Sequence, residues 1–193
     1  MNLSRRVLLF LVLAAAQLVV PAWVIHTWEN TLREGQQFKF RTAPVDPYDA
    51  FRGRYVALRI ESNSVPPSEE IANLPRGSTI YASIAVDPSG FAHFDKGSVK
   101  PFASEPYMKA RVWWASEGRV QMDLPIDRFY MNEKLAPRAQ QAYVSHSTRT
   151  NRTAYVLVRV KNGLGVVEDL YIDDEPVTQY LKKSAAGEPE TSL

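Results

Sequence analysis

Hydrophobic residues follow two different patterns along the chain. The first, from Val7 to Ile25, is apolar except for Gln17 and has no polar face of the kind seen on helices that cover a soluble domain. At about 1.5 Å per residue, a helix of this length nearly spans a hydrocarbon core of about 30 Å. Trp23 and Trp28 lie where an interfacial aromatic belt is expected. We therefore predict a single transmembrane anchor at residues 7–28.

The charges that precede this run predict its orientation. Arg5 and Arg6 come directly before the apolar residues, and positively charged residues stay on the cytoplasmic side of a span. Residues 1–6 are accordingly expected in the cytoplasm and the rest of the chain outside it, as in a signal-anchor. The alternative is a cleaved signal peptide, because Ala14 and Ala16 form an A-x-A cleavage pattern.

After residue 35 the second pattern begins, in which short segments alternate between apolar and polar residues. Turn sequences of the types Asp-Pro-Ser-Gly, Glu-Gly and Asn-Gly separate three pairs of these segments, which predicts three hairpins. Short strands at this spacing are typical of a mainly β fold, here an antiparallel β sandwich or a partly open barrel. The predicted strands lie at residues 37–42, 55–61, 79–86, 91–94, 107–115, 119–124, 153–161 and 165–173.

Two segments depart from the alternation. Good helix formers follow Pro137, and proline is tolerated in a first helical turn, so a short helix is expected from Pro137 to about Tyr143. A further helical turn is possible at residues 68–73. Beyond residue 180 the chain is small and polar, which predicts a disordered tail at 181–193. An extracytoplasmic β domain at 36–180 would then lie between the anchor and the tail.

Composition narrows the kinds of site that the chain can carry. The 23 basic and 21 acidic residues leave a net charge of +2, and the basic residues are scattered, which argues against nucleic acid as a partner. The absence of cysteine excludes disulfides, thiol nucleophiles and cysteine-based metal centres. His26, His93 and His146 lack the spacing of metal ligands, so we expect neither a metal nor a cofactor.

Residues 42–62, TAPVDPYDAFRGRYVALRIES, gather carboxylates, arginines, tyrosines and a glycine directly before a predicted strand. Asp46 followed by Pro47 suits a type I turn, and a glycine suits a strand entrance whose backbone angle is closed to other residues. A structural corner therefore explains the segment, and a binding surface is the alternative. An acid–base or metal site is disfavoured, because a fixed cation at Arg54 lowers carboxylate pKa values and competes with a metal. The candidate binding residues are Asp46, Tyr48, Asp49, Arg52, Gly53, Arg54 and Tyr55.

This segment resembles the signature of the GDYXXLXY proteins, a family of membrane-anchored bacterial proteins of uncharacterised function. The signature P-x-D-P-x-D-x-x-x-G-D-Y-x-x-L-x-Y is matched at Pro44, Asp46, Pro47, Asp49, Gly53, Tyr55 and Leu58. A late Y-F-x-x-E element is similar at Phe129, Tyr130 and Glu133, whereas Arg54 replaces the family's aspartate and Ile60 its second tyrosine. The resemblance covers most of residues 30–180. It implies a periplasmic domain on a bacterial inner-membrane anchor, often associated with multi-spanning membrane proteins, and it implies no particular activity.

A serine hydrolase is the enzymatic alternative. SNSVPP at residues 62–67 resembles a degraded S-x-S-M-x-P box of signal peptidases, with Ser64 as the nucleophile and Lys96 or Lys100 as the base. Such a lysine must be buried to lose its proton near neutral pH, whereas HFDKGSVK is expected to be a solvated turn. We therefore expect a non-enzymatic binding or accessory module for an envelope or multi-spanning membrane protein, with a signal-peptidase-like serine/lysine envelope hydrolase as the alternative.

The adjacent tryptophans offer one more candidate contact. Trp113 and Trp114 lie on a predicted strand, so their side chains should point to opposite faces. One is then expected in the core and the other half exposed, where it could contact a partner or a lipid headgroup.

Overall fold

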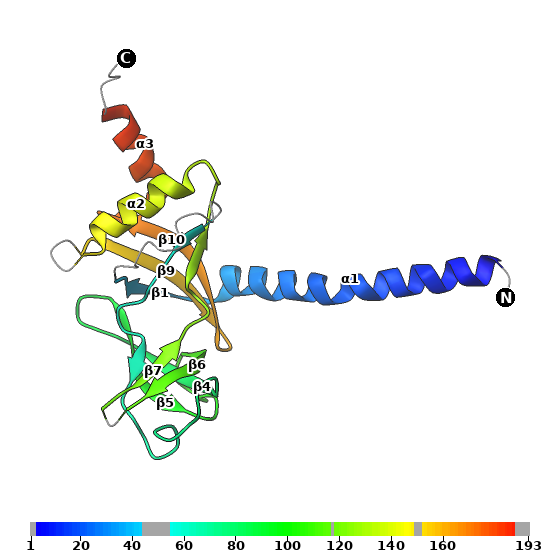
Figure 1. Ribbon diagram of the computed structural model, residues 1–193, viewed down its shortest axis with the longest axis horizontal. Coiled ribbons are helices and arrows are strands. Elements are labelled where there is room, and N and C mark those ends of the chain that lie inside the picture. The colour runs from blue at the N-terminus through cyan, green and yellow to red at the C-terminus, as the bar shows by residue number, and fades with distance from the viewer. Residues whose placement is uncertain (1–2, 44–54, 117, 149–151, 188–193) are drawn as a thin grey trace.

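The computed structural model describes residues 3–43, 55–116, 118–148 and 152–187, and it confirms a mainly β fold behind an N-terminal apolar helix (Figure 1). Within these residues the strands form one nine-stranded mixed sheet, in the order β11-β10-β9-β1-β5-β4-β6-β7-β3, and a separate β2-β8 ribbon. The sheet stays open and closes into no barrel over the described residues. The elements are α1 (Leu3–Glu34), β1 (Gln36–Arg41), β2 (Tyr55–Ala57), β3 (Ser64–Val65), β4 (Thr79–Val86), β5 (Ala92–Ser98), β6 (Tyr107–Ala115), β7 (Val120–Asp123), β8 (Arg128–Tyr130), α2 (Ala136–His146), β9 (Ala154–Lys161), β10 (Leu164–Ile172), β11 (Glu175–Pro176) and α3 (Val177–Gly187).

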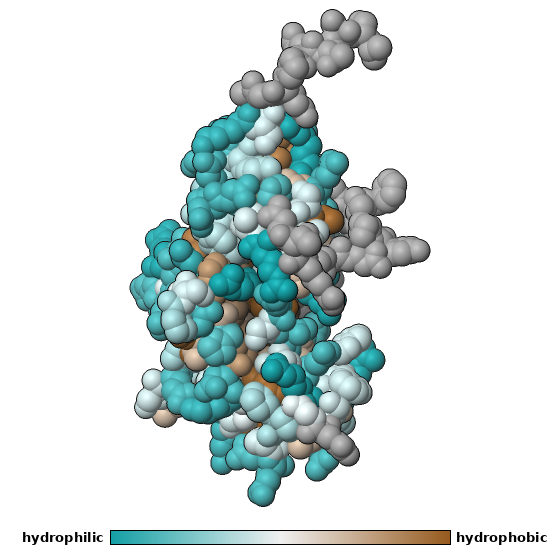
Figure 2. Space-filling view, turned by 90° about the vertical axis from the view of Figure 1, so that its left-hand side faces the viewer, coloured by the Kyte–Doolittle hydropathy of each residue, from teal (hydrophilic) through white to brown (hydrophobic). Residues whose placement is uncertain are grey.

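Helix α1 projects sideways from the middle of the elongated β domain (Figure 1). Its segment Val7–Glu34 is long and apolar enough to cross a membrane. Large side chains all along it are exposed, with Phe10 at 68% and Trp23 at 67%. Such a surface is costly in water and suits lipid, so α1 is compatible with membrane anchoring. The face of the domain turned away from α1 is by contrast mostly hydrophilic (Figure 2).

The end of α1 is attached to the β domain through β9 and β10. Glu34 and Lys161 form an ion pair, and the Arg159 guanidinium donates a hydrogen bond to the carbonyl of Gly35 (3.2 Å). A Cβ added to Gly35 would lie 2.4 Å from the Thr31 carbonyl oxygen and 3.1 Å from a backbone nitrogen of β9. Only glycine therefore lets the chain leave the helix and enter β1 so close to β9.

The three predicted hairpins are confirmed as β4–β5, β6–β7 and β9–β10. At the tip of β9–β10, Asn162 and Gly163 both have positive φ, 51° and 81°, as a type I′ turn requires. One pairing departs from the antiparallel expectation: β1 is antiparallel to β9 but parallel to β5, through Phe40 and Ala92. A tight turn forces only sequence neighbours to run antiparallel, and a long stretch of chain separates β1 from β5.

The predicted side-chain alternation of residues 55–61 is also confirmed. Val56, Leu58 and Ile60 are buried, although only Tyr55–Ala57 is a regular strand. The short helix predicted from Pro137 is confirmed as α2, which extends to His146. Its buried residues Ala139 and Tyr143 belong to the same core as those of the main sheet.

The prediction that one of the adjacent tryptophans lies in the core is wrong. Trp113 is 51% exposed and Trp114 is 57% exposed. The cause is a bulge in β6, where Val112 pairs with Met122 and Trp114 already pairs with the next residue, Gln121. A bulge adds one residue to its strand and so interrupts the strict alternation of faces.

Two further segments differ from the prediction. The solvated turn expected around Lys96 is part of β5, where a bulge lies opposite Ser83 of β4 and the Lys96 amide donates to the Ser83 hydroxyl (3.0 Å). In the region expected to be a disordered tail, residues 181–187 continue helix α3. Val177 and Leu181, one helical turn apart, are both buried, and this packing outweighs the polar composition that follows.

Candidate functional site

Only one of the predicted binding residues lies within the described part of the chain. Asp46, Tyr48, Asp49, Arg52, Gly53 and Arg54 all lie outside it, and Tyr55 begins β2. The structure does describe the residues on either side of residues 44–54. We use the name signature base for these flanking residues, 41–43 and 55–61.

Backbone hydrogen bonds join the two sides of the signature base. Thr42 and Ile60 form an antiparallel bridge, and the Ala43 amide donates to the Arg59 carbonyl (2.8 Å). Thr42 is buried, and its hydroxyl donates to the Ala154 carbonyl of β9 (2.9 Å). The two described ends of the chain on either side of residues 44–54 are therefore held at a fixed distance from each other and against β9.

Helix α2 holds both sides of the signature base. The Tyr143 hydroxyl donates to the carbonyl of Ala43 (2.7 Å) and accepts from the amide of Arg59 (3.3 Å). One turn earlier, Gln140 accepts from the amide of Ala57 (2.8 Å). Tyr143 is completely buried, and this burial raises the pKa of its phenol, so the hydroxyl stays protonated and can donate.

Strand β2, which we call the signature strand, pairs with β8, which contains Phe129 and Tyr130 of the late element. In the β2-β8 ribbon, Tyr55 pairs with Tyr130 and Val56 with Phe129. The Tyr55 and Tyr130 rings meet edge to face with centroids 5.8 Å apart, and the Arg128 guanidinium lies 5.2 Å from the Tyr55 ring. Tyr130 is 65% exposed, so the ribbon presents tyrosine and arginine to its surroundings.

A cleft of about 340 Å³ separates this ribbon from helix α1, and we call it the ribbon cleft. Phe129 and Val167 contribute apolar walls, while Arg128 and Glu168 contribute charge. Glu168 accepts hydrogen bonds from Arg159 and Gln37, and the bond from Arg159 is the main reason that its pKa is lowered. The remaining lining includes Trp28 of α1, Pro125, Asp127, Tyr130, Gly165 and Val166.

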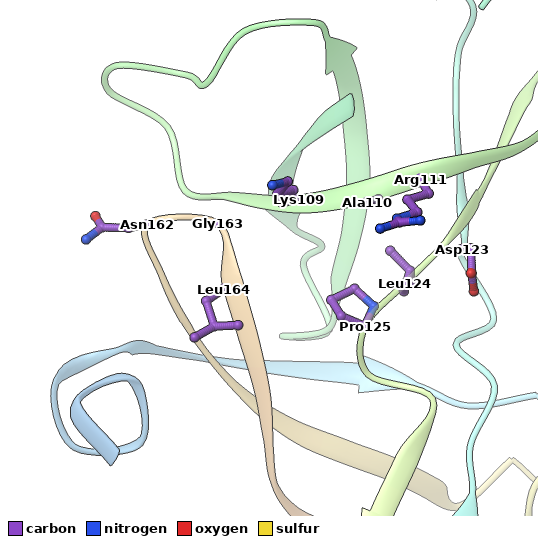
Figure 3. Close-up of a pocket in the computed structure, with 9 residues that line it drawn as sticks. All are labelled: Lys109, Ala110, Arg111, Asp123, Leu124, Pro125, Asn162, Gly163 and Leu164. Atoms are coloured by element: carbon purple, nitrogen blue, oxygen red, sulfur yellow. The ribbon is translucent and has the colours of Figure 1, made fainter. Parts of the chain in front are cut away.

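A second hollow, of about 330 Å³, shares Pro125 with the ribbon cleft. Figure 3 shows that its lining comes from three places: β6, the residues around the end of β7, and the β9–β10 turn. The Lys109 amide of β6 donates to the Gly163 carbonyl of that turn (2.8 Å). The ribbon and this hollow therefore both lie beside the β9–β10 hairpin, which also contacts the end of α1.

The contacts of Ser64 and Lys96 do not favour the hydrolase alternative. Ser64 is buried in β3, where its hydroxyl accepts from the Arg119 guanidinium (2.9 Å). The Lys96 ammonium is exposed and donates to Glu105 (3.2 Å), which raises the pKa of the lysine. A general base needs the opposite shift. Over the described residues, no group of three His, Cys, Asp or Glu side chains could hold a metal ion.

The sequence carries no clear signal for several residues of this site. Arg128 belongs to a strand of only three residues, too short for an alternation to be visible, and its partner β2 is more than seventy residues away by position number. The sequence predicts that Tyr143 lies at the end of a short helix. An aromatic residue there is expected to be buried, but its hydrogen-bond partners cannot be predicted. Trp28 was expected at a membrane interface, and the structure adds its place in the ribbon cleft.

Comparisons with known proteins agree with the signature. No curated protein and no solved structure matches this chain. A family model described as "GDYXXLXY protein" matches residues 17–170, which includes the second half of α1, the signature base and the β2-β8 ribbon. Since this match covers most of the chain, the protein belongs to the GDYXXLXY family.

Proposed function

We propose that this protein is a membrane-tethered, extracytoplasmic accessory module that binds a multi-spanning membrane protein through the ribbon cleft and carries out no catalysis itself. The observation that carries the proposal is the assembly of the signature strand and the late element into one ribbon beside the anchor. The signature alone is explained by a structural corner. Its pairing with an exposed tyrosine and an arginine favours a contact surface.

The height of the cleft above the bilayer supports a partner in the same membrane. The apolar run of α1 ends at Ile25, and Trp28 lies about 4.5 Å further along the helix axis at about 1.5 Å per residue. Tryptophan prefers this interfacial zone. The loops and helix ends of a neighbouring membrane protein lie at the same depth.

The side chains of the ribbon suit a protein contact. Tyrosine and arginine are enriched among residues that dominate binding energies, and Arg128 and Tyr130 are the two exposed residues of β8. The ring of Tyr55 supports both Tyr130 and Arg128. Because α2 fixes the signature base from behind, little ordering is required when a partner binds.

Orientation follows from the charges on the chain. Arg5 and Arg6 precede the apolar run, so the β domain belongs on the periplasmic side of a bacterial inner membrane. A carboxy-terminal fusion to alkaline phosphatase should be active, while the matched fusion to green fluorescent protein should remain dark. Fluorescence from the second fusion together with an inactive phosphatase would contradict this placement.

The partner contact is tested by photocrosslinking in native membranes. A benzoylphenylalanine in place of Tyr130 should give a discrete adduct with a multi-spanning membrane protein, identified by mass spectrometry. The control position is Val86, which is 55% exposed on β4. Arg128→Glu should reduce the Tyr130 adduct severalfold without changing the amount of protein in the membrane. Equal adducts from both positions, or none from Tyr130, would rule out the ribbon as the contact surface.

A further inference from the structure

The two exposed tryptophans of β6 line a groove that the ribbon cleft does not include. Arg76 and Asn73, from the loop before β4, form one side, while Trp113, Trp114 and Gln121 form the other. Its volume is about 560 Å³. We call it the tryptophan groove.

Exposure of two large aromatic side chains side by side is unusual for this domain. Outside α1, the exposed large apolar residues in the described part of the chain are Val86, Val99, Trp113, Trp114 and Tyr130. Among these, Trp113 and Trp114 are adjacent. Trp113 lies on the exposed face of β6, and the bulge brings Trp114 to the surface beside it. Bulges often re-aim a side chain at a site, and contiguous exposed apolar surface marks places where something binds.

One side of the groove is already organised. The Arg76 guanidinium stacks on the Trp113 ring, with its central carbon 3.6 Å from the ring centroid. This stacking holds both side chains in place, so a ligand orders fewer rotamers on binding. The N–H groups at the edge of the Arg76 guanidinium can donate a bidentate pair of hydrogen bonds to a carboxylate.

We propose that the tryptophan groove binds an acidic polysaccharide. The C–H face of a pyranose ring packs on a flat aromatic surface, and Trp114 provides one that is 57% exposed. The amides of Asn73 and Gln121 each donate and accept hydrogen bonds, as sugar hydroxyls do. Arg76 then selects sugars that carry a carboxylate. No residue in this set is equipped for chemistry, so the site binds without cleaving.

An extended peptide suits this groove less well. Strand β6 pairs with β7 as far as Ala115 and with β4 as far as Arg111, which leaves beside the groove only a short stretch of one edge for a peptide to join. A bilayer surface also suits it less well, because the aromatic side chains line a hollow with amide groups rather than the tip of a protruding loop. Vesicles are included in the test below to decide this directly.

The test is a binding titration with the purified full chain in detergent micelles. The probes are a hyaluronan hexasaccharide, which carries carboxylates, and chitohexaose, a neutral chain of N-acetylhexosamines. Calorimetry and tryptophan fluorescence should show hyaluronan binding at least about tenfold more tightly than chitohexaose, and added salt should reduce this preference. Because the titration uses isolated protein, its result is independent of the partner and orientation proposed above.

Variants identify the groove as the site. Trp114→Ala should weaken hyaluronan binding by about tenfold or more, since a stacked tryptophan typically dominates a contact. Arg76→Ala should remove the preference for the acidic probe, and Arg76→Lys should restore it only in part, because lysine lacks the planar fork. The control is Val86→Ala, also exposed on the sheet, which should bind as the unchanged protein does. Unfolding curves of all the variants confirm that each one is folded.

Three results would overturn the proposal. The first is equal affinity for the two oligosaccharides, or no binding of either. The second is a folded Trp114→Ala variant that still binds hyaluronan with unchanged affinity. The third is fluorescence quenching of Trp114 by phosphatidylglycerol vesicles but not by hyaluronan, which would make the groove a membrane-surface contact instead.

Discussion

Helices α1 and α2 use apolar residues in opposite ways. From Val7 to Ile25, α1 is apolar around nearly its whole circumference, yet its large side chains are exposed. Helix α2 has 11 residues and buries only Ala136, Ala139 and Tyr143, and it still holds both sides of the signature base. The amount of apolar surface on a helix therefore predicts whether it suits lipid or a protein core. Its few hydrogen bonds and buried contacts decide which other segments it holds in place.

The physical reason is that the exposed side chains of α1 suit lipid, whereas α2 packs on a β domain. A helix in lipid needs no packing partner, because hydrocarbon is as apolar as its side chains, and its backbone groups are satisfied within the helix. A helix on a β domain is held by a narrow apolar face and by hydrogen bonds from buried polar groups that must find partners. Substitutions in the two helices should therefore affect different measurements.

The largest effect is expected in α1. Replacing Leu13 and Leu18 together with arginine should cost about 6–8 kcal/mol of insertion free energy, since each arginine costs about 3 kcal/mol near the centre of a span and each leucine contributes favourably. The protein should leave the membrane fraction, as measured by carbonate extraction. Isoleucine at both positions is the control and should leave it membrane-bound. Retention of the double arginine variant would show that α1 does not hold the chain in lipid.

A smaller effect, on folding rather than location, is expected in α2. Tyr143→Ala should lower the free energy of unfolding by about 3–5 kcal/mol, because it leaves a cavity and removes both bonds to the signature base. Gln141→Ala, at an exposed neighbour, should change it by less than about 0.5 kcal/mol. Denaturant unfolding in micelles measures both. Similar values for the two variants would contradict the role assigned to Tyr143.

Tyr143→Phe isolates the hydroxyl and should cost about 1–3 kcal/mol at neutral pH. The folded-state pKa of Tyr143 is raised, so the folded form binds the proton more tightly and stability falls as pH rises above about 10, the pKa of an unfolded tyrosine. The phenylalanine variant should lose less stability over this range. Some loss persists in it, because burial also raises the pKa of Tyr155, to about 12. Parallel pH curves for the two proteins would show that the Tyr143 phenol is not protected.

The smallest effect is expected where the end of α1 contacts β9 of the β domain. Lys161→Ala removes the ion pair with Glu34, and because this carboxylate is exposed to solvent the free energy of unfolding should change little. The difference should shrink further at high salt, and membrane extraction should be unchanged. A loss of stability as large as that of Tyr143→Phe would mean that the helix end contributes to the stability of the domain far more than an exposed pair can.

Local chemistry explains which parts of the fold could be predicted. The Asn162-Gly163 turn selects its own backbone angles, so the β9–β10 hairpin follows from a few adjacent residues. The alternation that buries Val56, Leu58 and Ile60 is likewise present in the sequence. The bulge beside Trp113 was not predictable, because a bulge depends on the pairing of two strands and leaves no mark in the alternation of either one.

The sequence by itself determined the apolar N-terminal helix, the mainly β class, the three hairpins and the family signature, because each depends on residues close together in the chain. Only the tertiary structure decided that the signature strand pairs with the late element, that Tyr143 joins both sides of the signature base, and that Trp28 faces the same cleft. These contacts join residues far apart in sequence. Their geometry depends on how the whole core packs, which no local pattern encodes.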